Sequence, residues 1–191
     1  MEFSRIDSNQ KFGKQALMTC EVKERGKEGT QRATLYSLDP QNASDRNDVR
    51  YSKQTFCIAS DFERQQYEKF PQKEFYVVNN DKTGEVVSCA EISHHYSPML
   101  NEKGGVYTLI EEAKLNKKYD NGEKPLLAYI ARQAVDKYEE AVIGACEESA
   151  LENFEGDNFT KLRTGEIVAP KENFMKIMKQ ADEDCSTEYL V

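Results

Sequence analysis

Apolar and polar positions alternate in two pairs of stretches in the first half of the chain, and a period of two predicts β-strands. LMTCEV and RATLYSL flank the turn RGKEG, and their inward-facing positions are Met18, Cys20, Val22, Ala33, Leu35 and Ser37. EFYVV and EVVSCAEI flank the turn NNDKTG, in which Asn and Asp favour a turn and Gly84 accepts positive φ. The pattern therefore predicts two antiparallel β-hairpins.

The pattern changes to a helical period after the next predicted strand, VYTLIEEA. A helix is expected to begin near Pro125, because proline suits the first helical position. Its predicted buried face consists of Leu126, Leu127, Ile130, Ala131, Ala134, Val135 and Tyr138. AVIGAC follows, and its periodicity leaves open a further buried strand or a continuation of the helix.

Shorter elements are predicted in the rest of the chain. Ser60 caps an expected helix that Glu63 supports as a capping box and Pro71 ends. SHHYSPMLNEKGG is expected to be a loop and ALENFEGDNFTKL a short helix. RTGEIV, NFMKIMK and STEYLV are predicted to supply one or two closing strands, with APKE and ADEDC as turns.

This order of elements predicts an α+β fold, layered as in α/β proteins, with a mixed, mostly antiparallel central sheet flanked by helices. The chain has 191 residues, which suits one domain with a sizeable core. We expect residues 1–15 to form a flexible N-terminal segment and residues 16–191 a single domain.

A formal charge of −8 argues against nucleic acid or an anionic membrane as the main partner. No apolar run approaches the ~20 residues of a membrane helix, and the N-terminus lacks the apolar core of a signal peptide. We expect a cytoplasmic protein, and export without a cleavable signal stays open. Five widely spaced cysteines and two adjacent histidines predict reduced thiols and no metal site.

The stretch Val106–Tyr138 reads as a strand, a polar loop and a helix, an arrangement that often binds phosphate at the helix N-terminus. Together with FYVVNNDKTGEVVSCAEI, its segment LIEEAKLNKKYDNGEKPLL resembles the GCN5-related N-acetyltransferases over about residues 32–191. That family's loop is usually written L-x-x-L-x-V-x-P-x-x-R-G-x-G-x-G/A-x-x-L-L. Here Asp120 stands at the Arg position, Asn121 stands at the first Gly position, and the loop is one or two residues short.

The resemblance implies that acetyl-CoA is the cofactor and that backbone N–H groups between Leu115 and Pro125 hold its phosphates. The cofactor-binding residues that it implies are Leu115, Lys117, Lys118, Asn121, Gly122, Lys124 and Leu126. The implied reaction transfers acetyl to a primary amine of a small molecule or a protein. The acidic chain suits a cationic acceptor such as a polyamine, an aminoglycoside-like amine or a Lys side chain.

The resemblance also implies a carboxylate at the end of the central strand that takes the proton of the amine. Glu111 and Glu112 are the candidates, and strand alternation lets only one of them face the cleft, Glu112 being weakly favoured. The alternative is a solvated strand end that pairs with Lys114 or Lys117. His94, His95 and Tyr96 are candidate substrate-binding residues, since a histidine titrates near neutral pH.

Other functions stay open at this point. The family often uses a Tyr to reprotonate the thiolate, but NFEGDNFTKL offers only Phe154 and Phe159, with Tyr189 or Cys146 as distant substitutes. A non-catalytic binding module on the same fold is one alternative, and its acidic surface would consist of Glu139, Glu140, Glu147, Glu148 and Glu152. A second is a Yop-type effector acetyltransferase or protease, which HYSPMLNEKGGVYTLIEEAKLN loosely resembles, with Cys146 or Cys185 as nucleophile beside a histidine.

Overall fold

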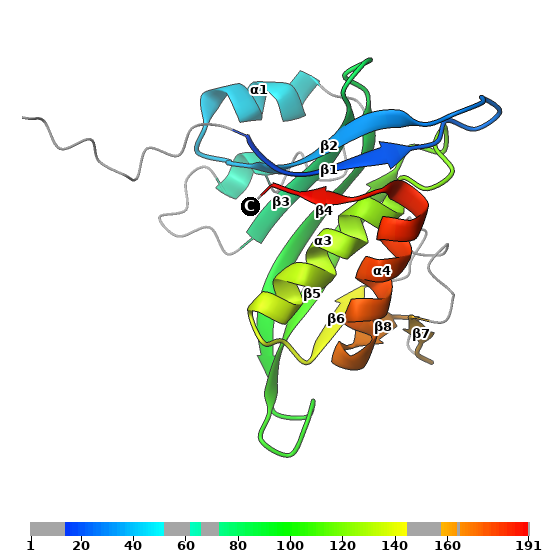
Figure 1. The fold of residues 1–191 in the computed structure, drawn as a ribbon. Coiled ribbons are helices and arrows are strands. Elements are labelled where there is room, and N and C mark those ends of the chain that lie inside the picture. The colour runs from blue at the N-terminus through cyan, green and yellow to red at the C-terminus, as the bar shows by residue number, and fades with distance from the viewer. Residues whose placement is uncertain (1–13, 52–61, 66–72, 145–157, 164, 191) are drawn as a thin grey trace, which may run out of the picture.

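A nine-stranded sheet forms the centre of the molecule in the computed structural model, which describes residues 14–51, 62–65, 73–144, 158–163 and 165–190 (Figure 1). The strands are β1 (Gln15–Val22), β2 (Gln31–Leu38), β3 (Lys73–Asn80), β4 (Val86–Ser97), β5 (Gly105–Leu115), β6 (Ala141–Gly144), β7 (Thr160–Lys161), β8 (Ile167–Pro170) and β9 (Glu188–Tyr189). They lie in the order β7-β8-β6-β5-β4-β3-β2-β1-β9. Each neighbouring pair is antiparallel except β5 and β6, which are parallel. The predicted fold class is confirmed.

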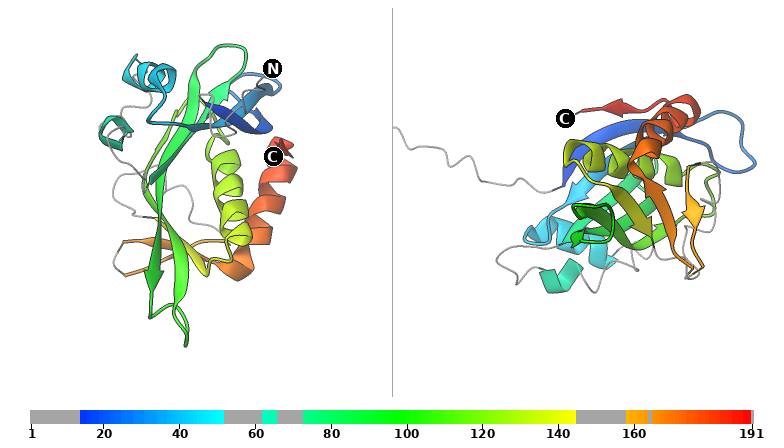
Figure 2. Two further views of the ribbon diagram at one scale, coloured as in Figure 1. Left: turned by 90° about the vertical axis from the view of Figure 1, so that its left-hand side faces the viewer. Right: turned by 90° about the horizontal axis from the view of Figure 1, so that it is seen from below.

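Helices cover both faces of this sheet. Helix α3 (Glu123–Asp136) and helix α4 (Phe174–Cys185) lie side by side on one face, which we call the α3 face (Figures 1 and 2). Helix α1 (Ala43–Tyr51) lies on the other, which we call the α1 face. A short 3-10 helix, η3 (Lys171–Asn173), precedes α4. In the part of the chain that is described, no helix has the length and apolar character needed to cross a membrane.

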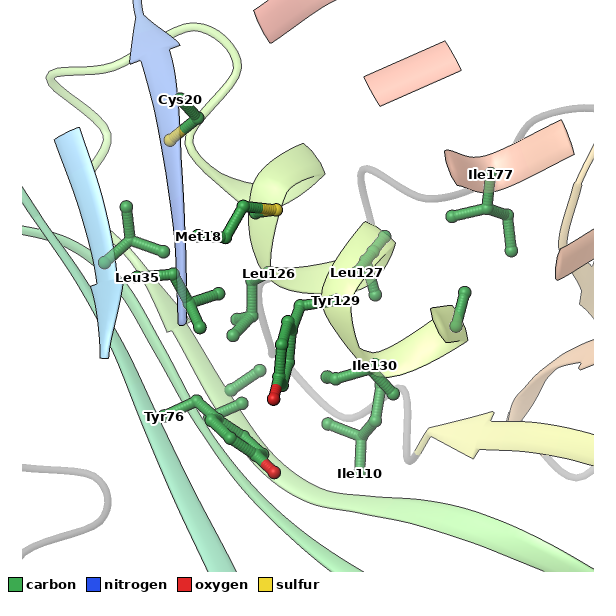
Figure 3. Packing of buried hydrophobic residues seen from close by; sticks show 14 of the residues in the cluster. Met18, Cys20, Leu35, Tyr76, Ile110, Leu126, Leu127, Tyr129, Ile130 and Ile177 are labelled. Carbon is green, nitrogen blue, oxygen red and sulfur yellow. The ribbon is translucent and has the colours of Figure 1, made fainter. Parts of the chain in front are cut away.

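The main core lies between the sheet and α3. Leu126, Leu127 and Ile130 on α3 are buried against Met18, Leu35, Tyr76 and Ile110 from four strands (Figure 3). Ile177 on α4 joins the same cluster. A smaller cluster on the α1 face joins Val49 of α1 to the strand residues Leu38, Phe75, Val77, Val86 and Cys89, together with Phe62. Both hairpins and the helix after Pro125 are therefore confirmed.

Several sequence predictions are corrected. Residues 93–97 continue β4 instead of opening a loop, because their backbone pairs with β5 as far as Ser97 and Gly105. NFMKIMK and ADEDC form α4, not a strand and a turn, since Phe174, Ile177, Ala181 and Cys185 recur at helical spacing and are buried. Residues 141–144 of AVIGAC are strand β6, which decides between the two possibilities left open.

The buried face of α3 is narrower than expected. Val135 is 39% exposed, and Tyr138 is 90% exposed because it lies beyond the helix end in a left-handed conformation, with φ of 56°. Of the helix expected after Ser60, only residues 62–65 are described, and they are helical. Residues 145–157, which include most of the predicted short helix, lie outside the described residues.

Candidate active site

An extra residue in β5 determines which face of the sheet carries the side chains of Glu111 and Glu112. Ile92 of β4 pairs with Ile110, whereas Glu91 pairs with Glu112, so Glu111 is a β-bulge with no partner position on β4. A bulge interrupts the alternation of side chains along a strand. Ile110 and Ala113 both belong to the core on the α3 face, and Glu111 and Glu112 lie between them. The expectation that only one of the two glutamates faces the cleft is therefore wrong, because both lie on the α1 face.

Glu111 heads a chain of polar side chains on that face. The Ser93 hydroxyl donates a hydrogen bond to Glu111 Oε1 at 2.6 Å, and Ser93 Oγ lies 2.7 Å from His95 Nε2. A hydroxyl has one proton, so Nε2–H of His95 must donate to Ser93 while Ser93 donates to Glu111. In the neutral imidazole His95 Nδ1 is then an acceptor, and both hydrogen bonds point toward Glu111, so Ser93 and His95 together orient its carboxylate.

Solvent reaches Glu111 and His95, and neighbouring residues hold both side chains in place. The side chain of Glu111 is 31% exposed and that of His95 is 43% exposed. The His95 ring stacks on Tyr107 of β5 with 5.5 Å between ring centroids. Ser93 is buried, so its hydroxyl is fixed between the two titratable groups. Next to it, buried Glu91 contacts Lys73 Nζ, while Glu112 is exposed.

The group formed by Glu111, Ser93 and His95 lies beside the parallel pairing of β5 with β6. The parallel pairs between described residues of β5 and β6 run from Tyr107 and Ala141 to Ile110 and Gly144. Glu111 is the next residue of β5. Glu111 therefore follows a stretch of β5 that lies between β4 and β6.

His94 has a different role from its neighbour. It lies on the α3 face, where Nδ1 is 2.6 Å from Glu139 Oε1 and Nε2 is 3.3 Å from Glu74 Oε1. Lys137 Nζ contacts both His94 Nε2, at 2.7 Å, and Glu74 Oε1, at 2.9 Å. Thr108 donates to the other oxygen of Glu139. These bonds tie the segment after α3 to strands β3, β4 and β5.

The charges of this cluster shift two pKa values. Hydrogen bonds to Glu139 and then Glu74 raise the pKa of His94 to about 9, since two carboxylates outweigh the Lys137 ammonium and partial burial. Burial of Glu74 opposes its ionisation, but hydrogen bonds from His94, Tyr76 and Lys137 outweigh burial and lower its pKa to about 2. Among the candidate substrate-binding residues, His94 is thus part of a structural ion cluster, separated from His95 by the sheet. Tyr96 lies on the hairpin that projects from the sheet and is exposed.

The predicted cofactor loop is tightly bonded to other parts of the chain. Asn121 is buried; its Oδ1 accepts the backbone N–H of Lys23 at 2.8 Å, and its Nδ2 donates to the Asp184 carbonyl at 3.3 Å. Lys118 Nζ pairs with Glu85 at 2.7 Å, and Lys124 pairs with Asp184. Among the other predicted residues, Leu126 is in the core, Leu115 pairs with Ser88 of β4, and Lys117 is exposed.

The donor set of this loop does not fit the phosphates of acetyl-CoA. Asp120 occupies the position of the family's arginine and pairs with Arg25 at 2.8 Å. Gly122 is needed for packing: a Cβ there would lie 2.7 Å from Val87 Cγ1 and 3.4 Å from the Val87 carbonyl.

We expect Gly122→Ala to lower the free energy of unfolding by about 1–3 kcal/mol, because the added methyl group overlaps the buried, branched side chain of Val87. The measurement is urea unfolding. Gly122 has φ of −65°, so backbone strain does not contribute. The control is a double-mutant cycle with Val87→Ala, which should recover at least about 0.5 kcal/mol of the loss. Simple additivity of the two losses would contradict the proposed overlap.

The hypothesis of a cysteine nucleophile receives no support from Cys185. Its thiol is 1% exposed, and burial raises its pKa to about 12. Buried cysteines of this kind are unreactive, because the thiolate is the nucleophile. Cys146, the other candidate, lies outside the described residues. Cys20 and Cys89 are buried as well.

A thiol titration checks this conclusion. In a Cys57→Ser, Cys146→Ser variant we expect the three remaining thiols to be silent to a disulfide reagent in buffer and to react fully in denaturant. The wild-type chain, which keeps Cys57 and Cys146, is measured beside it as the control. Fast reaction of one thiol in the folded variant, removed by Cys185→Ser, would contradict the assignment.

Other predicted residues lie away from Glu111. Tyr189 is on β9, at the far edge of the sheet beyond β1, and Phe159 packs against the main core. Phe154 lies outside the described residues. The acidic surface is also corrected: Glu139 is buried in the His94 cluster and Glu140 pairs with Lys171, while Glu147, Glu148 and Glu152 are not described.

Solved structures share this architecture. A structure of a mutant AtaT toxin bound to the C-terminus of the antitoxin AtaR and acetyl-CoA matches with a TM-score of 0.55 at 12% identity, covering 78% of this chain and 99% of that chain. A structure of AtaTR bound with acetyl-CoA matches with a TM-score of 0.57 at 10% identity, covering 76% and 97%. The chain has the fold of the GCN5-related N-acetyltransferases. The NatC complex bound to Gag peptide and CoA matches with a TM-score of 0.50 at 12% identity, covering 72% and 98%. No protein-family model and no curated protein sequence matches.

Sequence reasoning missed Ser93, Tyr107 and Lys73 as members of the polar cluster. Glu91, Ser93 and His95 are spaced by two, so they share one face of a strand. That signal was available in the sequence, but it requires β4 to extend through the histidines. Only pairing with β5 determines the extension.

Proposed function

We propose that this protein transfers an acyl group, acetyl in the simplest case, from an acyl thioester such as acetyl-CoA to a primary amine. The observation that carries the proposal is the Glu111 carboxylate, which a bulge in β5 places on the α1 face, with Ser93 hydrogen-bonded to it and His95 hydrogen-bonded to Ser93. The shared fold supports the reaction class by analogy.

The chain's own residues perform the acid–base part of this reaction. An amine is protonated at neutral pH, and Glu111 both attracts the ammonium and accepts its proton. Ser93 holds the carboxylate in place, and His95 Nδ1 offers a second acceptor in contact with solvent. When bound, the thioester supplies the acyl carbon: the amine nitrogen bonds to that carbon, the C–S bond breaks, and the thiol leaves with one proton.

The acceptor that suits this surface is a cationic primary amine on a small molecule or a protein. Glu111 and Glu112 lie on the same face and the chain carries a formal charge of −8. Opposite charge raises the rate of encounter and orients the amine nitrogen toward the carboxylate.

A transfer assay tests the proposal. The full chain is incubated with acetyl-CoA and, in parallel, with the acetyl thioester of N-acetylcysteamine, using spermidine, an aminoglycoside and a Lys-containing peptide as acceptors. Release of free thiol and mass spectrometry of the acceptor are the readouts. We expect acceptor-dependent thiol release with at least one amine. Absence of transfer from both donors to every acceptor would contradict the proposal.

A non-catalytic binding module on the same fold is the second candidate, and the closed cofactor loop favours it. It predicts that cationic amines bind without turnover. Calorimetry with spermidine, run beside the transfer assay, separates the two functions, because the enzyme must also release thiol.

A further inference from the structure

The N-terminus of α3 has few backbone donors left for an anion. An open helix N-terminus offers several unpaired N–H groups, which is why phosphates bind there. Here Pro125 has no N–H, and the N–H of Lys124 donates to the Asn121 carbonyl at 3.3 Å. The partly buried Glu123 carboxylate lies in the first turn of the helix, where an external anion would bind.

The cations around this helix end are paired as well. Arg25 Nε lies 2.8 Å from Asp120 Oδ1, and Lys124 Nζ contacts Asp184 of α4. Lys118 Nζ lies 2.7 Å from Glu85 and 3.5 Å from Glu24. Arg25, Lys118 and Lys124 are therefore each shared with a carboxylate that would repel a pyrophosphate. Lys117, the remaining predicted lysine, is exposed.

The loop is also fixed in this closed arrangement by contacts far apart in the sequence. The N–H of Asp120 donates to the Lys23 carbonyl at 2.9 Å, and the N–H of Arg25 donates to the Lys118 carbonyl at 2.7 Å. Asn121 Nδ2 lies 3.1 Å from Cys185 Sγ at the end of α4. Opening the loop for phosphates would break contacts with both the β1–β2 turn and α4.

We propose that this protein recognises its acyl donor by the thioester end alone and does not bind the nucleotide end of coenzyme A. The inference rests on the proposed acyl transfer. The donor class is then any acyl thioester, because neither a pyrophosphate nor an adenosine on the thiol is needed for binding. The resemblance implies an open loop at this helix that binds phosphates; in this chain the same loop holds the β1–β2 turn and α4 together.

Binding of the isolated nucleotide end tests the inference without turnover. Calorimetry and thermal denaturation of the full chain are run with 3′,5′-ADP, the nucleotide end of coenzyme A. We expect no saturable heat and no change in melting temperature up to roughly 10 mM, because a specific ligand must stabilise the native state. Saturable binding with a dissociation constant below roughly 1 mM would overturn the inference.

Kinetics with two donors give a second test. We expect kcat/KM for acetyl-CoA and for the acetyl thioester of N-acetylcysteamine to agree within about threefold, since the nucleotide end adds no interaction. A preference for acetyl-CoA above roughly 30-fold would overturn the inference. If neither donor reacts, the proposed acyl transfer fails, and the 3′,5′-ADP measurement still decides whether the loop binds nucleotide.

Removal of the internal carboxylates provides a gain-of-function check. Glu123→Gln with Asp184→Asn removes two negative charges at this helix end and the anionic partner of Lys124, so we expect 3′,5′-ADP to bind at least about tenfold more tightly than to wild type. The matched control is Glu183→Gln with Glu188→Gln, which removes the same charge from exposed carboxylates of α4 and β9. Equal gains in both double variants would indicate a net-charge effect and count against the proposed closure.

Discussion

Glu111→Gln is expected to lower the rate of acyl transfer by about 10²–10⁴-fold, the usual contribution of a positioned general base. The amide keeps an oxygen that accepts the Ser93 hydroxyl, so the local structure is preserved. The substitution therefore removes the proton acceptor while changing the free energy of unfolding by less than about 1 kcal/mol. The measurement is kcat and KM under saturating donor, with urea unfolding of the same samples.

Glu112→Gln is the matched control. Glu112 lies on the same face one residue further along β5, but it is exposed and faces Glu91 instead of Ser93. We expect its kcat to stay within about threefold of wild type, because Glu111 and its hydrogen bond from Ser93 are intact. If Glu111→Gln keeps its activity while His95→Gln loses it, the general base is His95 and not Glu111.

Glu139→Gln is expected to lower the free energy of unfolding by about 3 kcal/mol, the largest stability effect that we predict. Glu139 is nearly fully buried and bonds both His94 and Thr108. Its removal leaves a charged imidazole in a half-buried place with only Glu74 as its anionic partner. Urea unfolding at pH 6 is the measurement, and Glu140→Gln, whose carboxylate forms an exposed pair with Lys171, is the control that should change stability by less than about 1 kcal/mol.

The same cluster makes stability depend on pH in a defined direction. The pKa of His94 is raised from 6.5 to about 9, so its contribution is complete below pH 6.5 and is lost as pH rises through about 9. The pKa of Glu74 is lowered from 4.5 to about 2, so its contribution is complete above pH 4.5 and is lost as pH falls through about 2. We expect maximal stability between about pH 4.5 and 6.5. By pH 9 the free energy of unfolding should have fallen by about 2 kcal/mol, a figure already reduced for solvent screening of the half-buried His94 ring. In Glu139→Gln this fall should be smaller.

An NMR titration of His94 separates the contributions to this shift. Glu139→Gln should lower the pKa of His94, whereas Lys137→Gln should raise it further, because the Lys137 ammonium opposes protonation. A His94 that titrates near its ordinary value in the wild-type protein would contradict the cluster as described.

The chain's order of residues by itself determined the hairpins, the strand after them and the helix that follows Pro125. In these segments the hydrophobic period is local and strong, and turn residues such as Gly84 and the NNDKTG run agree with it. It also determined that the cofactor loop departs from the family, because Asp120 and the missing glycines are visible without coordinates.

Only the tertiary structure decided the chemistry of the site. The bulge at Glu111 arises from pairing with β4, so alternation within β5 alone gave the wrong facing for the two glutamates. His94 and His95 are neighbours in sequence but lie on opposite faces. The partner of His94 is Glu139, 45 residues further along the chain, whereas His95 bonds Ser93, which in turn bonds Glu111 across 18 residues. Closure of the loop likewise depends on Asp184 and Lys23, which no local pattern connects to Asn121. Contacts between distant segments carry no local period, and for this reason they appear only when the chain is folded.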